Sequence, residues 1–221
     1  MTATATSASA PATTATPAVE ADDLRALPAA PEPRRRNTIL VATMFVIAAA
    51  TMLIAGLIGG YLQARDATEA AGELWPPEGV ALPNVPLLVA YLTLLMSSVT
   101  AQWAVSAIKV GARRQMFVAI GITLVLGLSF VNALSFSWTQ LALVAGESPY
   151  ANAVYAVSVT HLFLVLGAHV LFLVMGFRAL GGQFSPRNAE FVSAAAAFWH
   201  FTVAAGAVVW WFLWFLPGGP S

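Results

Sequence analysis

The sequence predicts an all-α membrane protein, built as a bundle of five transmembrane helices. Of its 221 residues, 59% are hydrophobic and only 9% are charged, well away from the balance of soluble proteins. Long apolar stretches free of Asp, Glu, Lys and Arg cover residues 38–63, 85–108, 116–145, 150–177 and 191–216. Each exceeds the ~20 residues that cross a ~30 Å hydrocarbon core as a helix.

The segment before the first stretch has a different composition. Residues 1–37 are rich in Ala, Thr and Pro and have few large apolar side chains, so they cannot bury enough surface to offset the entropy of ordering. We expect a disordered cytoplasmic tail, followed by one transmembrane domain over residues 38–221. The absence of cysteine excludes disulfides, thiolate metal sites and thiol catalysis.

The loop charges predict the orientation of the bundle. Loops that carry Lys and Arg stay on the cytoplasmic side, and here basic residues alternate with acidic or uncharged connections. This pattern places the N-terminus in the cytoplasm and the C-terminus outside. The basic residues are Arg34, Arg35 and Arg36 before the first stretch, Lys109, Arg113 and Arg114 in the second loop, and Arg178 and Arg187 in the fourth.

The first loop contains a stiff, aromatic motif, Trp75-Pro76-Pro77-Glu78-Gly79. Consecutive prolines lack the N–H groups of a helix and fix the backbone φ angle. Taken alone, the motif predicts a rigid external turn with Trp75 lying on the membrane surface.

Small residues mark faces on which helices can approach closely. Gly56 and Gly60 form a G-x-x-x-G pattern in the first stretch. Residues 193–197 and 204–207, all Ala, Gly or Ser, give the fifth stretch a thin face, meaning a face of small side chains. Such faces favour helix–helix packing in membranes. We expect any single face to close the bundle internally, and at least one to meet another protein.

The only ionisable residues in the middle of the stretches are His161, His169 and His200. His161 and His169 are separated by about 12 Å along one helix and about 80° around it, so they cannot bind one metal ion together. Two histidines on different helices could hold a haem. The simpler interpretation, which we favour, is a neutral imidazole hydrogen-bonded to Ser, Thr or a backbone carbonyl. Copper or zinc would need further ligands.

Several of these features together resemble subunit III of the haem–copper oxidases. The similarity covers about residues 38–216 and rests on the Trp-Pro-Pro-x-Gly loop, His161 in the fourth stretch and Trp199-His200-Phe201 in the fifth. Tyr61, followed by Ala64-Arg65 at the end of the first span, and Ser97-Ser98-Val99-Thr100 in the second also look like the family.

The sequence departs from the family at its intramembrane carboxylates. Ala50 and Val131 or Asn132 stand where the family commonly has glutamates, and Thr202-Val203 where it favours Val-Asp. His161-Leu162-Phe163-Leu164 replaces its His-Gly-x-His. The chain therefore resembles a divergent member, with an accessory subunit of a nitric oxide reductase as an alternative.

The resemblance implies a non-catalytic accessory subunit that stabilises the catalytic subunit and holds lipid. It implies subunit I, and subunit II, as partners, together with membrane phospholipids but no nucleic acid. Haem and copper would belong to a partner, with no cofactor in this chain, and the location would be a bacterial-type inner membrane. A small b-type cytochrome stays open as an alternative, and a stand-alone carrier is disfavoured because no span is broken by proline.

Overall fold

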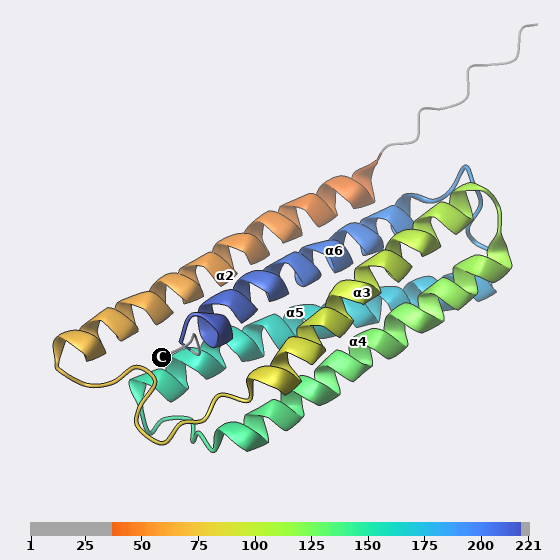
Figure 1. Cartoon of the computed structure of the whole chain (residues 1–221). Helices are drawn as coiled ribbons and strands as arrows, with labels where there is room; N and C mark the ends of the chain where they lie inside the picture. The colour runs from red at the N-terminus through yellow and green to blue at the C-terminus, as the bar shows by residue number, and fades with distance from the viewer. Residues whose placement is uncertain (1–36, 218–221) are drawn as a thin grey trace, which may run out of the picture. The chain divides into compact units, whose positions relative to one another are not determined.

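The described part of the chain, residues 37–217, consists of five long helices in a computed structural model (Figure 1). All five are long and apolar enough to cross a membrane, and no strand occurs among these residues, so the predicted all-α fold class is confirmed. The expected disorder of the tail concerns residues that lie outside the described ones. The helices are α2 Thr38–Ala70, α3 Asn84–Lys109, α4 Arg113–Leu141, α5 Pro149–Leu180 and α6 Glu190–Trp210, which continues into a π-helix, η1 Trp211–Phe215.

The fifth helix of the bundle is its most enclosed one. α6 packs against α2, α3 and α5, while α4 packs against α3 and α5 (Figure 1). The thin face predicted for this segment makes this possible, since Ala194, Ala195, Ala196 and Ala205 are buried and let neighbouring backbones approach. Most small residues of this face therefore pack within the chain, whereas Ala204 and Ala207 are exposed.

The largest differences from the predicted boundaries are at the C-terminal ends of α2 and α4. α2 continues past residue 63 to Ala70, through a polar turn in which Arg65 pairs with Glu69 (Nε–Oε1 2.8 Å). Apolar patterning marks the part of a helix that suits lipid, whereas such i, i+4 pairs extend the helix beyond it. α4 ends at Leu141 rather than at residue 145, because Ala142 adopts a left-handed conformation with φ 49°.

The start of α2 is capped by a residue far away in the sequence. Glu190, in the first turn of α6, accepts hydrogen bonds from the backbone N–H groups of Ile39 (2.7 Å) and Leu40 (3.2 Å). The first N–H groups of a helix have no partner within that helix, and a carboxylate near them also interacts favourably with the helix dipole. One carboxylate thus ties the ends of α2 and α6 together.

The glycine pattern of α2 does not pack within the chain. Gly56, Gly59 and Gly60 are exposed, and no atom lies within 4 Å of where a Cβ would stand on any of them. The expectation that this face closes the bundle internally was therefore wrong. Its hydropathy and spacing cannot distinguish an inward from an outward face, because lipid accepts the same residues as the core does.

Candidate functional site

The seam between α3 and α6 carries two adjacent residues of the Trp-His-Phe motif. Trp199 is fully buried, and its indole Nε1–H donates to the Ser97 hydroxyl at 2.9 Å. The Ser97 hydroxyl in turn donates to the Leu94 carbonyl. A buried indole N–H without an acceptor would be costly. The Ser97 hydroxyl provides that acceptor, and the bond holds α6 against α3.

The next residue of α6, His200, is hydrogen-bonded to the next serine of α3, Ser98. Its Nδ1 lies 2.5 Å from the Ser98 hydroxyl, and its Nε2 lies 3.2 Å from Oε1 of Gln102, one turn further along α3. Unlike Trp199, His200 is only partly buried. Consecutive residues of α6 therefore meet consecutive serines of α3, one pair inside the bundle and the other at its surface.

His161 joins α5 to α6 in the interior. It is fully buried, and its Nε2 lies 2.9 Å from the Thr202 backbone carbonyl, an acceptor that requires the N–H on Nε2. The ring packs near Tyr91 and Phe130 (centroid distances 6.0 and 5.7 Å). This geometry matches the neutral, hydrogen-bonded imidazole that the sequence favoured.

His169 is buried on the same helix but makes no bond to another helix. Its Nδ1 lies 2.8 Å from the Val165 carbonyl, one turn back on α5. The ring packs against Trp199 at a centroid distance of 4.9 Å. The interhelical hydrogen bond considered for the histidines is thus replaced, at this residue, by contact between rings.

Two glycines make room for these rings. The sequence placed Gly206 in the small-residue face of residues 204–207 without its ring contact, and sequence reasoning missed Gly127. A Cβ at Gly127 of α4 would stand 2.5 Å from the His169 ring and 2.7 Å from Trp199. A Cβ at Gly206 would stand 3.0 Å from the His161 ring. Neither glycine belongs to a G-x-x-x-G pattern, so only the partner helix reveals its purpose.

The three histidines are not brought together as a ligand set. Among residues 37–217, no three His, Asp or Glu side chains form a group that could hold a metal ion. The ring nitrogens of His200 face α3, whereas His161 bonds a carbonyl of α6. The hydrogen bonds of His161 and His200 join helices, whereas that of His169 stays within α5.

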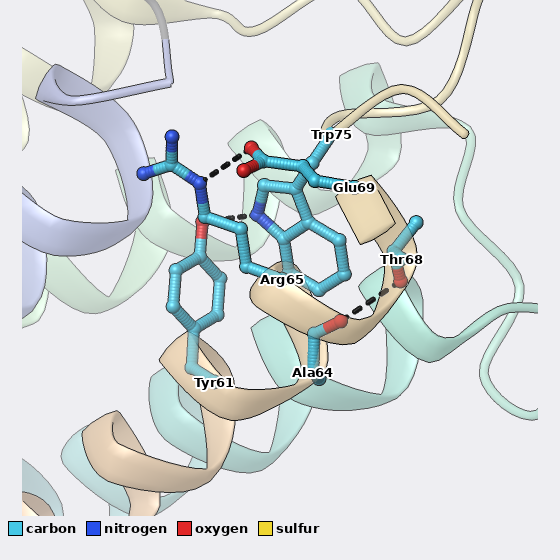
Figure 2. Close-up of polar contacts among 6 residues, drawn as sticks. All are labelled: Tyr61, Ala64, Arg65, Thr68, Glu69 and Trp75. Atoms are coloured by element: carbon cyan, nitrogen blue, oxygen red, sulfur yellow. Dashed lines mark hydrogen bonds and ion pairs between the residues drawn. The ribbon is translucent and has the colours of Figure 1, made fainter. Parts of the chain in front are cut away.

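The Trp-Pro-Pro loop brings Trp75 against Tyr61 of α2 (Figure 2). The indole Nε1–H of Trp75 donates to the Tyr61 hydroxyl at 2.9 Å, and the Trp75 ring meets Tyr61 and Tyr150 edge-on, at centroid distances of 5.2 and 4.9 Å. Trp75 is thus partly buried against two helices, and its position at the membrane surface stays a prediction. A sequence shows that Trp favours an interface, but not that two tyrosines of α2 and α5 are within reach.

The rest of the motif shapes the turn that carries Trp75. The Val80 N–H donates to the Pro77 carbonyl at 3.2 Å. Gly79 has a φ of 82°, a conformation that glycine adopts without steric cost. Pro76, joined to Trp75 by a cis peptide bond, and Pro77 are partly buried. The motif thus forms a compact turn that holds the aromatic contact.

Phe201, the third residue of the Trp-His-Phe motif, lies at a shallow groove between α2 and α6. The groove has a volume of about 310 Å³ and is lined almost entirely by apolar side chains. They include Ile54 and Ile58 from α2, and Ala204 and Val208 from α6. Such a surface suits an aliphatic chain.

Comparison with known proteins gives one consistent result. The model of the family described as cytochrome c oxidase subunit III matches residues 35–216. The chain is 26% identical to cytochrome c oxidase subunit 3 of Marchantia polymorpha over 173 residues, which cover 77% of this chain and 63% of that one. It is 31% identical to the Gallus gallus protein of that name over 150 residues (66% and 55%) and 29% identical to the Branchiostoma lanceolatum protein over 183 residues (81% and 66%).

The chain spans about half to two thirds of the length of these curated relatives. The family match nevertheless extends over all five helices, including the Trp75 turn and the Trp199-His200 seam. On this evidence the chain is a multi-pass membrane protein that belongs to the cytochrome c oxidase subunit III family.

Proposed function

We propose that this chain is a non-catalytic accessory subunit of a respiratory haem–copper oxidase, which stabilises the catalytic subunit in the membrane during aerobic electron transport. The observation that carries the proposal is the family match over residues 35–216. It is supported by the use of the buried polar groups, since Trp199 and His161 are both engaged in bonds between helices. A chain organised in this way supplies a rigid framework.

The partners of this subunit would be subunit I, which would hold haem and copper, and subunit II. This chain would hold neither group. Its support is the packing of the histidines: both ring nitrogens of His200 face α3. The ring nitrogens without a hydrogen-bond partner, Nδ1 of His161 and Nε2 of His169, are buried within the bundle. A haem ligand needs a free imidazole nitrogen directed at the iron.

The proposed location is a bacterial-type inner membrane, with the N-terminus in the cytoplasm and the C-terminus outside. The distribution of charge along the five helices supports this orientation. Basic side chains flank the connection between α3 and α4 (Lys109, Arg113 and Arg114) and lie near the connection between α5 and α6 (Arg178 and Arg187), while the connection after α2 carries only acidic ones. This is the pattern expected if the basic ends stay in the cytoplasm.

We also propose that the groove between α2 and α6 holds a phospholipid chain. Its lining is apolar along the helices, from Ile54 to Ile58 on one side and around Phe201 on the other. Native mass spectrometry after mild detergent extraction should detect retained phospholipid. Widening the groove edge with Phe201→Ala should reduce that lipid, whereas Phe163→Ala on the exposed face of α5 should not.

Two alternative functions make distinct predictions. In a nitric oxide reductase, the same accessory role would be accompanied by a different catalytic partner. In a small b-type cytochrome, His200→Ala would abolish a reduced-minus-oxidised absorbance band of the chain. Neither alternative changes the packing of the bundle.

The test is purification through a tag on this chain. We expect a haem-containing catalytic subunit to be recovered in a fixed ratio with it, and its identity by mass spectrometry would distinguish an oxidase from a nitric oxide reductase. Recovery of the intact chain without a haem-containing subunit, under conditions that preserve other respiratory complexes, would contradict the proposal.

A further inference from the structure

A second pocket opens at the polar end of α2, away from the apolar groove between α2 and α6. It has a volume of about 340 Å³, within the range of about 300–1,000 Å³ that small-molecule sites usually have. The end of α2, the Trp75 turn and the start of α5 form its walls. The lining combines acidic, hydroxyl and apolar side chains, and this combination indicates what the pocket can hold.

Two carboxylates line this pocket without a cation beside them. Glu73 and Glu78 are exposed, and neither side chain is paired with another of residues 37–217. Arg65, the basic residue at this end of α2, is paired with Glu69 instead (Nε–Oε1 2.8 Å). No lysine or arginine lines the pocket. The positive end of the α5 dipole is equivalent to about half a charge, so the pocket keeps an excess of negative charge.

A buried hydroxyl in the wall of the pocket has no hydrogen-bond partner. Tyr150 lines the pocket and is only 1% exposed, yet its hydroxyl is unpartnered among the described residues. A buried polar group without a partner is unfavourable, and a ligand with N–H donors supplies the missing bond. The Thr68 hydroxyl donates to the Ala64 carbonyl at 2.8 Å (Figure 2), so it has only acceptor capacity left. The polar lining therefore favours a positively charged donor.

We propose that this pocket binds one cation that carries N–H donors on an aliphatic stem, either an alkyl ammonium or a guanidinium group. Glu73 and Glu78 hold the charge, and the Tyr150 hydroxyl accepts one N–H. The stem lies against the apolar wall, which includes Leu74 and Trp75, because such stems bury their CH₂ groups while the cationic end stays in a polar environment. This inference goes beyond the accessory function and does not depend on it.

Other ligands match the lining less well. A zwitterionic lipid headgroup brings a phosphate together with its ammonium group, and the pocket offers that phosphate two carboxylates and no lysine or arginine. A metal ion would need more ligands, and residues 37–217 contain no group of three His, Asp or Glu side chains that could hold one. Two sources share the proposed chemistry: a free polyamine, and a lysine or arginine side chain of another protein.

Calorimetric titration of the purified chain in neutral detergent tests the pocket, with spermidine and agmatine as probes at constant ionic strength. We expect both to bind, and the double variant Glu73→Gln/Glu78→Gln to weaken binding about tenfold. Tyr150→Phe keeps the ring and should weaken it about threefold. Glu147→Gln, an exposed carboxylate outside the lining, is the control. No binding by the wild-type chain, or equal weakening by the control, would overturn the proposal.

Cross-linking in native membranes identifies the source of the cation. Because the chain has no cysteine, Leu74→Cys places a single benzophenone label at the pocket, and Val144→Cys places one at an exposed loop position outside it. A protein adduct at 74 but not at 144 assigns the cation to a protein side chain. A polyamine retained by the wild-type chain and lost from the double variant, seen by native mass spectrometry, assigns it to the free compound.

The two proposals fail separately. Equal adducts at 74 and 144, with no polyamine retained, would overturn the cation site even if both probes bind in detergent. The recovery of a haem-containing subunit through the tag does not depend on this pocket, so the accessory function would stand. Conversely, a chain that binds both probes but recovers no such subunit keeps the cation site and loses the accessory function.

Discussion

The indole Nε1–H of Trp199 donates to the Ser97 hydroxyl at 2.9 Å, across the seam between α6 and α3. The Ser97 hydroxyl donates in turn to the Leu94 carbonyl, so a buried aromatic side chain on α6 is connected to the backbone of α3. Trp199 also packs against His169 and Phe172 (centroid distances 4.9 and 4.7 Å). One residue therefore connects α3, α5 and α6.

Replacing this indole should weaken the bundle. Trp199→Phe removes the donor and leaves a void, and together these should lower the free energy of unfolding by about 2–4 kcal/mol. Trp211→Phe changes an exposed tryptophan and is the control. Thermal unfolding in detergent measures both, and equal melting temperatures for the two variants would contradict the importance of the seam.

The close approach at Gly127 predicts a contrast between two glycines. Gly127→Ala places a Cβ 2.5 Å from the His169 ring and 2.7 Å from Trp199, and overpacking of this kind costs about 1–3 kcal/mol. Gly56→Ala meets no atom within 4 Å and should be neutral or slightly stabilising, because alanine favours the helix. Urea or heat unfolding of the purified variants checks the order, and a tolerated alanine at 127 would show that the rings lie elsewhere.

The contribution of the Trp75–Tyr61 hydrogen bond to the free energy of unfolding can be measured with a double-mutant cycle. Tyr61→Phe removes the hydroxyl acceptor and Trp75→Phe removes the indole donor. Because both changes break the same bond, the double variant should be less destabilised than the sum of the single ones, with a coupling of about 0.5–1.5 kcal/mol. Strictly additive effects on the unfolding free energy would mean that the loop does not bond to α2.

The cap on α2 predicts a graded effect at Glu190. Glu190→Ala removes the acceptor for the Ile39 and Leu40 N–H groups and should cost about 0.5–2 kcal/mol. Glu190→Gln keeps an acceptor oxygen without the charge and should cost less. Hydrogen exchange at the first turn of α2 provides a local readout, and unchanged protection of Ile39 in the alanine variant would argue against the cap.

The sequence predicted the helices well and their contacts poorly, for a physical reason. Charge-free stretches identify segments that lipid can surround, so the five spans and the all-α class follow directly. Lipid and protein interior accept the same residues, so hydropathy could not show that Gly56 faces outward or that Gly127 faces two rings. Trp75 illustrates the same limit, because its position depends on tyrosines 14 and 75 residues away along the chain.

The candidate site was predictable as a set of residues but not as an arrangement. Trp199, His200 and Ser97-Ser98 stand out as motifs, yet their pairing across the seam depends on the register between α3 and α6. The exposure of Gln102 depends on the same register. Long-range register of this kind is determined by side-chain packing between helices, which one sequence does not reveal.

The central claim, that this chain supports redox chemistry carried by another subunit, is tested most directly by the reduced-minus-oxidised spectrum of the chain before and after separation from its complex. We predict haem bands in the complex and none in the separated chain. His200 is bonded through both ring nitrogens to Ser98 and Gln102, while His161 and His169 are buried and each bond one backbone carbonyl. One haem per separated chain, lost on His200→Ala, would contradict the claim.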